Sequence, residues 1–246
     1  LLPPYLTLPP PPQLRFLPSI YFWSVALNAK AGGSSYYFET LTATITSIAS
    51  LAYLIMATDQ GYEGGSDTGD RQFFWIRYVD WTLTTPLMLL DIAGLAGANA
   101  DSKMLLVMTD ILMVLAGVIG ANMNEDSSGD HEHYKWAFFA LGMMFYMPIV
   151  SFLVSDLGKG SGKAGALSKK VGFFTLVLWS AYPVVWVVAE GTEVISPDTE
   201  AICYTILDVL AKSVFGLMIV SARDAIEDAN RAGSGYTMGG IADDGE

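Results

Sequence analysis

Long apolar stretches separated by short polar ones are the dominant pattern along this chain. An α-helix needs about 20 mostly apolar residues to cross the hydrocarbon core of a bilayer. The stretches predict seven transmembrane helices, over residues 14–30, 36–58, 73–97, 103–123, 134–155, 170–189 and 199–222. The first is short and contains Arg15 and Pro18, so we expect it to be kinked or preceded by an irregular stretch.

The composition supports a membrane protein. Hydrophobic residues make up 52% of the chain and charged residues only 15%, whereas soluble domains carry about 25% charged residues. We therefore predict an all-α protein with one seven-helix bundle over residues 14–223. A proline-rich segment, 1–13, precedes the bundle. An acidic tail, 224–246, follows it and is expected to be disordered beyond about Arg231.

Basic residues between the helices predict the orientation, because cytoplasmic loops carry more lysine and arginine. The gaps after the first, third and fifth helices and the tail hold Lys30, Lys103, Lys159, Lys163, Lys169, Lys170, Arg223 and Arg231. The N-terminal segment and the other gaps hold only Arg15, Arg71 and Lys135. The N-terminus is therefore expected outside the cell and the C-terminus in the cytoplasm.

Lys212 is the most unusual residue of the seventh apolar stretch. A charged, unpaired lysine inside a membrane helix costs several kcal/mol, so such a residue is a functional candidate. A buried lysine can also act as an amine nucleophile towards an aldehyde. Asp208 lies four residues earlier, on the same helix face. An amine beside a carboxylate is the pairing that a protonated Schiff base requires.

The third predicted helix carries a polar stripe on one face, formed by Arg77, Asp80, Thr84 and Asp91. The two aspartates are separated by roughly 16 Å along the helix axis. Two carboxylates that far apart inside a membrane suggest two stations on a proton path. The alternative, polar residues that only close helix–helix contacts, explains several ionisable groups in register less well.

The two aspartates are expected to differ in charge. Arg77, one turn outward from Asp80, can pair with it and keep it ionised. Asp91 is flanked by apolar residues such as Leu90 and Ile92, so it should be desolvated and protonated at rest.

Aromatic residues on the sixth helix form a second stripe. Trp179, Tyr182 and Trp186 share one face, and Pro183 can give the helix a hinge. Trp81 follows Asp80 on the third helix. Such stripes more often indicate core packing than a cofactor site, but Lys212 favours walls for a long conjugated aldehyde.

Three motifs, RYVDWTLTTPLMLLD, WSAYPVVW and LDVLAKSVFG, resemble those of the microbial rhodopsin family, and among its members most closely the bacteriorhodopsin-type outward proton pumps. The segment YKWAFFALG is more similar to the eukaryotic pumps of the fungal and algal branch than to the haloarchaeal ones. The resemblance covers the second to seventh helices. It implies all-trans retinal bound to Lys212 as a protonated Schiff base.

The resemblance also implies residue roles. Asp80 matches the primary counterion and proton acceptor, Asp208 the second counterion, and Asp91 the cytoplasmic proton donor. Arg77 matches the arginine between counterion and exit, Thr84 the middle residue of the Asp80–Asp91 triplet, and Tyr53 a tyrosine near Asp208. The matches to the retinal pocket are Trp81, Thr85, Met88, Met113, Gly117, Phe139, Gly142, Trp179, Tyr182, Pro183 and Trp186, with Asp110 as the hydrogen-bond partner of Thr85.

Some positions depart from the family pattern or leave alternatives open. Met88 stands where leucine is usual, and Tyr146 where a smaller pocket residue is usual. Glu190 and Glu200 match the proton-release pair, but the loop before Glu190 is a residue shorter, so Glu193 competes for that role.

The implied activity is light-driven outward proton pumping, with no chemical turnover of a substrate. A sensory photoreceptor is an alternative, although sensors in this family usually lack a carboxylate at the Asp91 position. A light-gated channel is less consistent with the threonine-rich second helix, on which Glu39 is the one acidic residue. A non-photoactive transporter would not need Lys212.

The remaining features point away from other partners. The net charge of −12 argues against nucleic acid, and a single cysteine, Cys203, excludes an intramolecular disulfide. His131 and His133 lie in an acidic stretch and are interpreted as surface residues, so no metal site is predicted. We expect a multi-pass protein of the plasma membrane lipid bilayer, without an obligatory protein partner, and a homo-oligomer (trimer or pentamer) as in many family members.

Overall fold

The structure is a computed structural model that describes residues 13–31, 36–65, 70–122, 131–155 and 162–222, with residues 225 and 227. The predicted N-terminal segment and acidic tail lie almost entirely outside these described residues.

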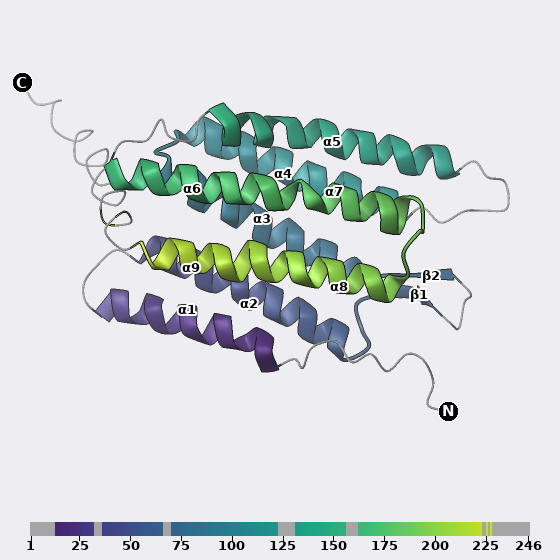
Figure 1. Cartoon of the computed structure of the whole chain (residues 1–246), viewed down its shortest axis with the longest axis horizontal. Helices are drawn as coiled ribbons and strands as arrows, with labels where there is room; N and C mark the ends of the chain where they lie inside the picture. Colours follow the sequence, from purple (N-terminus) through teal and green to yellow (C-terminus); the bar gives the residue numbers. More distant parts are fainter. Residues whose placement is uncertain are drawn as a thin grey trace, which may run out of the picture.

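Seven helical passes run side by side as one bundle (Figure 1). The first five are α1 (Gln13–Ala31), α2 (Tyr37–Ala57), α3 (Trp75–Leu95), α4 (Ala100–Ala121) and α5 (His131–Ser155). The sixth joins α6 (Gly162–Trp179), α7 (Ala181–Trp186) and the π-helical segment η1 (Val187–Gly191). The seventh joins α8 (Pro197–Asp208), the π-helical segment η2 (Val209–Val214) and α9 (Phe215–Val220). The predicted seven-helix fold is confirmed.

Five of the described passes are long and apolar enough to cross a membrane: Tyr37–Ala57, Ala100–Ala121, Tyr134–Ser155, Gly162–Gly191 and Pro197–Val220. The pass formed by α3 is less apolar because it carries Arg77, Asp80 and Asp91. The first pass is short, as expected, and contains Pro18.

The sixth pass begins at Gly162, earlier than the predicted residue 170. Hydropathy marks only where the apolar part of a helix starts, and a helix can extend beyond it into a polar region. Lys163, Lys169 and Lys170 occupy this extension and are exposed.

A short antiparallel hairpin, β1 (Glu63–Gly65) and β2 (Asp70–Phe73), lies between α2 and α3 and was not predicted. Each strand is too short and too polar to give an alternating pattern. Gly61 before it has a φ of 78°, and a Cβ there would lie 2.6 Å from Ile76 Cγ2, so this bend requires glycine. The hairpin lies where α3 and α8 begin (Figure 1), and we call this the hairpin end of the bundle.

The seventh pass has a defined start. Ser196 Oγ accepts a hydrogen bond from the backbone N–H of Thr199, and Pro197 occupies the first helical turn, a typical N-terminal cap. From this start, Glu200, Tyr204, Asp208 and Lys212 follow at intervals of four residues, and all four are buried. The four residues therefore form a buried polar stripe along the face of the seventh pass that is turned towards the bundle.

Lys212 itself lies in η2, where the helix widens from α to π geometry. Single π-turns inside α-helices are rare and are frequent at functional sites. The widening is a second local feature, besides burial, that distinguishes this position.

Two apolar clusters fill the bundle. The larger includes Leu89, Ile149 and Trp179, and the smaller, nearer the hairpin end, includes Trp81 and Trp186. Met113 and Tyr182 pack against both clusters. The region between the two clusters is therefore walled by large side chains from several helices.

Gly216 is the point of closest approach between α9 and the first two helices. A Cβ at Gly216 would lie 2.5 Å from Thr42 Cγ2 and 2.8 Å from Phe22 Cζ. We predict that Gly216→Ala destabilises the bundle by about 1–3 kcal/mol through overpacking. Thermal unfolding in detergent, followed by circular dichroism, would show a lower midpoint.

The matched control is Leu217→Ala, because the neighbouring Leu217 is 44% exposed. Its midpoint should stay near that of the original chain. Equal midpoints for the two variants would contradict the close packing at Gly216.

Candidate functional site

Lys212 is buried, with 3% of its surface exposed, and it has two carboxylate neighbours. Its Nζ donates a hydrogen bond to Asp80 Oδ2 and lies 3.3 Å from Asp208 Oδ1. Asp80 and Asp208 are themselves 1% and 2% exposed. A buried ammonium needs such partners, because desolvation without them costs several kcal/mol.

Asp208 is held by three further donors. Tyr53 Oη and Tyr182 Oη donate at 2.5 Å and 2.8 Å, and Trp81 Nε1 donates at 3.1 Å. These residues come from α2, α7 and α3. Hydrogen bonds of this kind favour the ionised carboxylate and fix its position beside Lys212.

Asp80 has fewer donors than Asp208. Besides Lys212 Nζ, Thr84 Oγ1 lies 3.3 Å from Asp80 Oδ1, while also donating to the Asp80 backbone carbonyl at 2.8 Å. The Asp80 carboxylate is therefore the less tightly held of the two and the one in hydrogen-bond contact with Lys212.

Arg77 does not pair with Asp80 in the structure, so this expectation is wrong. Its Nη1 lies 2.5 Å from Glu200 Oε1, and its guanidinium lies over the ring of Tyr204 at 4.5 Å. Arg77 lies one turn nearer the hairpin end of α3 than Asp80, and its long side chain extends to Glu200 at the start of α8.

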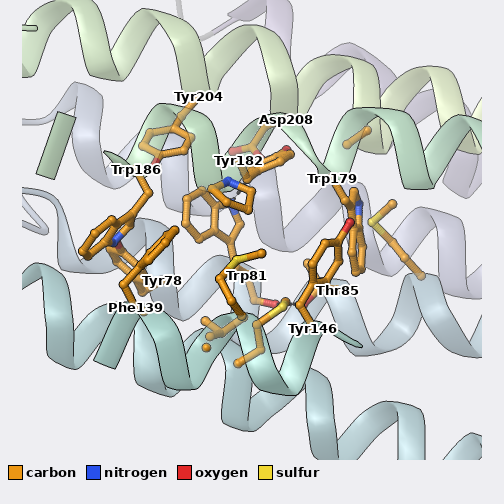
Figure 2. A pocket seen from close by; sticks show the side chains of 18 of the residues that line it. Tyr78, Trp81, Thr85, Phe139, Tyr146, Trp179, Tyr182, Trp186, Tyr204 and Asp208 are labelled. Carbon is orange, nitrogen blue, oxygen red and sulfur yellow. Dashed lines mark hydrogen bonds between the residues drawn. The ribbon is translucent and has the colours of Figure 1, made fainter. Parts of the chain in front are cut away.

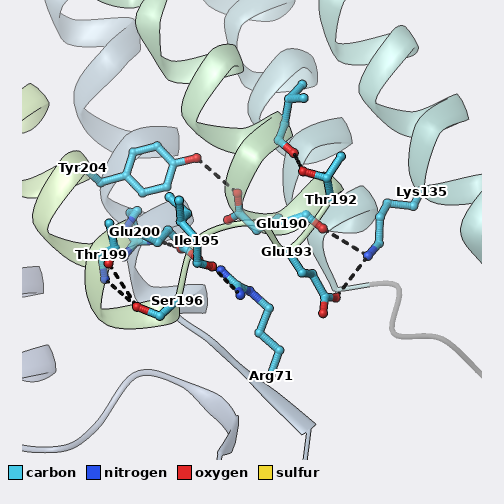
Figure 3. A network of polar contacts seen from close by, with 12 residues as sticks. Arg71, Lys135, Glu190, Thr192, Glu193, Ile195, Ser196, Thr199, Glu200 and Tyr204 are labelled. Atoms are coloured by element: carbon cyan, nitrogen blue, oxygen red, sulfur yellow. Dashed lines mark hydrogen bonds and ion pairs between the residues drawn. The ribbon is translucent and has the colours of Figure 1, made fainter. Parts of the chain in front are cut away.

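The hairpin end holds a network of charged groups (Figure 3). Glu190 and Glu200 are 4% and 2% exposed. Glu190 accepts hydrogen bonds from Tyr78 Oη at 2.7 Å and from Tyr204 Oη at 3.1 Å. Glu193, the competing candidate, has a side chain that is 54% exposed and lies 3.8 Å from Lys135 Nζ. Burial and hydrogen bonding favour Glu190 over Glu193.

Asp91 lies further along α3 than Asp80, on the side of Lys212 that is remote from the hairpin end. It is fully buried beside Leu89 and Ile92. Neither of its carboxylate oxygens has a hydrogen-bond partner within the described part of the chain. A buried carboxyl without a cation or donor is most stable in its neutral form, so the environments of Asp80 and Asp91 differ sharply.

A cavity of about 120 Å³ extends from Lys212 between the two apolar clusters. Figure 2 shows aromatic rings on its two sides, with Trp186 and Phe139 at one end and Trp179 and Tyr146 at the other. Most of the predicted cofactor-binding residues line it, namely Trp81, Thr85, Met88, Met113, Gly117, Phe139, Gly142, Trp179, Tyr182, Pro183, Trp186 and Lys212.

Asp110 lies just behind the cavity wall. It is fully buried, and its Oδ2 accepts a hydrogen bond from Thr85 Oγ1 at 2.6 Å. The bond orients Thr85, which does line the cavity.

The cavity suits the retinal that the resemblance implies. Its walls are mostly aromatic or apolar, and its charged groups gather around the Lys212 amine, which is the group that can bond to an aldehyde. Flat rings on both sides match a long conjugated chain. The residues present therefore fit this chromophore.

Sequence reasoning missed several residues of the site: Tyr78, Val114, Met143, Tyr204 and Ala211 line the cavity, and Arg71 contacts Glu200. A signal existed for two of them. Tyr78 lies three residues before Trp81, on the same helix face as that predicted pocket residue, and Tyr204 lies four before Asp208, on the face shared by Asp208 and Lys212. Nothing in the sequence indicated the partner of Arg71.

No group of three or more histidine, cysteine or acidic side chains suited to a metal ion occurs among the described residues. The side chains of His131 and His133 lie outside the described part of the chain.

A scan against family models matches residues 14–226 to one described as bacteriorhodopsin-like protein. The chain is 34% identical to opsin-1 of Neurospora crassa over 85% of this chain and 73% of that relative. It is 32% identical to bacteriorhodopsin of Halobacterium salinarum over 78% of this chain and 73% of the relative.

Solved structures agree with these relatives. A light-driven proton pump from Leptosphaeria maculans superimposes with a TM-score of 0.76 at 29% identity, covering 87% of this chain and 92% of that one. The light-driven proton pump of Coccomyxa subellipsoidea gives a TM-score of 0.77 at 29% identity, covering 85% and 92%.

We predict that Lys212→Ala abolishes formation of a visible pigment when retinal is added to the purified protein. The amine of Lys212 is the one lysine nitrogen that lines the cavity, and without it no bond to an aldehyde can form there. Absorption spectroscopy after retinal addition measures the result.

The control is Lys135→Ala, because Lys135 is also a buried lysine, 6% exposed, but does not line the cavity. This variant should still form the pigment. A red-shifted pigment in Lys212→Ala would contradict the site.

Proposed function

The chain belongs to the bacteriorhodopsin-like family of microbial rhodopsins and groups with its fungal and algal members, and on this basis we propose that it is a light-driven outward proton pump. The family includes light-driven pumps, which move ions without turning over a substrate. Membership also implies a retinal chromophore and a multi-pass membrane protein.

Retinal, all-trans and bonded to the Lys212 amine, would supply light absorption and the change of shape that drives the cycle. Lys212 Nζ holds a proton beside two carboxylates. Trp81, Trp179 and Tyr182 line the cavity beside Lys212 and would confine the chromophore there.

Asp80 is proposed as the proton acceptor. Its carboxylate is in direct hydrogen-bond contact with Lys212 Nζ, which is the geometry that proton transfer requires. The Asp208 carboxylate already accepts three hydrogen bonds, from Tyr53, Tyr182 and Trp81. The proton therefore goes to Asp80, the carboxylate with fewer donors.

Asp91 is proposed as the donor that returns a proton to Lys212 Nζ. Its carboxyl is buried and lacks a hydrogen-bond partner among the described residues, which favours a neutral, proton-bearing group. It lies on α3 beyond Asp80, away from the hairpin end. Loss of the proton towards one end and its replacement from the other would give the transport its direction.

The hairpin end is proposed as the exit on the extracellular side. Arg77, Glu190 and Glu200 lie there, and the charges of the loops support the same orientation. We propose the plasma membrane as the location, where this orientation would move protons out of the cell. A homo-oligomer and the absence of an obligatory partner remain predictions.

The single observation that carries the proposal is the difference between the two aspartates of α3, one paired with Lys212 and one buried without a partner. The relatives described as light-driven proton pumps support it.

We expect illuminated cells that express the protein with retinal to acidify an unbuffered medium. A protonophore should abolish this signal, because it collapses any proton gradient. External pH, recorded in light and dark, is the measurement. No pH change would reject pumping in favour of a sensor.

We predict that Asp91→Asn slows the return of the proton to the Lys212 nitrogen on the order of 100-fold, the typical loss when a positioned acid is removed. Recovery of the visible absorption band after a laser flash measures the rate.

Asp101→Asn is the control, since Asp101 is an exposed carboxylate on the next helix, α4. It should recover as fast as the original chain. An unchanged recovery in Asp91→Asn would show that Asp91 is not the donor.

A further inference from the structure

Glu200 is held by two arginines, and only one of them belongs to a bundle helix. Arg77 Nη1 of α3 lies 2.5 Å from Glu200 Oε1, and Arg71 Nη2 of strand β2 lies 2.9 Å from Glu200 Oε2. Each carboxylate oxygen therefore has its own guanidinium. The Glu200 side chain is 3% exposed and that of Arg71 is 16% exposed, so this second ion pair is largely shielded from solvent.

Arg71 has a further anchor. Its Nη1 donates a hydrogen bond to the backbone carbonyl of Ile195 at 2.9 Å. Ile195 immediately precedes Ser196, the residue that caps α8. Figure 3 shows the Arg71 side chain reaching from the hairpin to this loop and to Glu200. Hydrogen bonds therefore fix the Arg71 side chain at both of its terminal nitrogens, Nη1 and Nη2.

Glu190 has a different set of neighbours. Its carboxylate oxygens contact two phenols, Tyr78 Oη and Tyr204 Oη. The ammonium of Lys135 bonds to the Glu190 backbone carbonyl at 3.1 Å and lies near Glu193, not at the Glu190 carboxylate. A tyrosine hydroxyl can donate to a carboxylate or accept from a carboxylic acid, so Glu190 retains its contacts in either protonation state.

Glu200 does not have this freedom. A guanidinium can only donate and is always charged, so a proton on one Glu200 oxygen would displace the arginine bonded to that oxygen and remove the charge that pairs with both. Bidentate or paired arginine contacts are among the strongest charge-assisted hydrogen bonds. The two glutamates that the family resemblance treats as a pair thus have unequal environments. Arg71 is one of the two arginines that distinguish the surroundings of Glu200 from those of Glu190.

We propose that Arg71 is a positioning residue that holds Glu200 as a permanent carboxylate, so that Glu190 alone holds the proton at the hairpin end. The proposal rests on the proposed pumping function, because it assigns the group from which a transported proton would leave.

The dark-state test counts the carboxyl groups that titrate at the hairpin end. Infrared spectra of the retinal-loaded full chain are recorded against pH, and the carbonyl band of a protonated carboxyl is followed. Glu190→Gln should lose one titrating band. The double variant Arg71→Gln/Glu190→Gln should regain a titrating band, because Glu200 with one arginine left can take up a proton. No band in the double variant, or an unreduced signal in Glu190→Gln, would overturn the proposal.

Light-driven release provides the second readout. In vesicles with a pH-sensitive dye, Arg71→Gln should delay the appearance of the released proton by about tenfold, the effect of about 1.4 kcal/mol on a rate. Arg71→Lys should restore most of the timing. Gln72→Ala, at the next position of the same strand, where side chains point the opposite way, should leave it unchanged.

The outcomes separate the two claims. If the unaltered chain gives no light-driven pH change, the pumping function fails, while the dark titration still tests Arg71. If the chain pumps and Arg71→Gln releases protons on the original time course, Arg71 is only a structural tie between the hairpin and α8.

Discussion

The contact on which the site depends is the buried ion pair of Lys212 with Asp80 and Asp208. Removing one partner of such a buried pair typically costs about 3–5 kcal/mol, because the remaining charge is left without compensation. The surrounding polar groups follow from this constraint. Tyr53, Tyr182 and Trp81 donate hydrogen bonds to Asp208, and the four-residue spacing of Asp208 and Lys212 places both on the buried face of the seventh pass.

The two aspartates of α3 have different surroundings, and this difference could give proton transfer at Lys212 a direction. Asp80 faces a cation and a threonine hydroxyl, whereas Asp91 is buried and its carboxylate oxygens have no hydrogen-bond partner among the described residues. These surroundings, and no difference in the residues themselves, favour opposite protonation states for the two carboxyl groups. The hairpin end repeats the principle with two glutamates, one between arginines and one between tyrosines.

Much of the fold could be predicted because membrane helices are governed by local sequence. The seven passes follow from apolar length, and the shared faces of Asp80 with Asp91 and of Asp208 with Lys212 follow from helical periodicity. Contacts between elements could not be predicted in this way. Arg77 binds Glu200 instead of Asp80, and Arg71 reaches it from a hairpin too short to leave a pattern. Both depend on how the end of α3 meets the start of α8, which no single segment encodes.

The central claim is that the proton on the Lys212 nitrogen passes to Asp80. Time-resolved infrared spectroscopy after a flash tests it most directly, by following the carbonyl band of a newly protonated carboxylic acid. The account predicts a band that rises as the visible absorption is lost and that shifts in Asp80→Glu. A band that keeps its position in Asp80→Glu, or visible absorption that is lost without any carboxyl band, would contradict it.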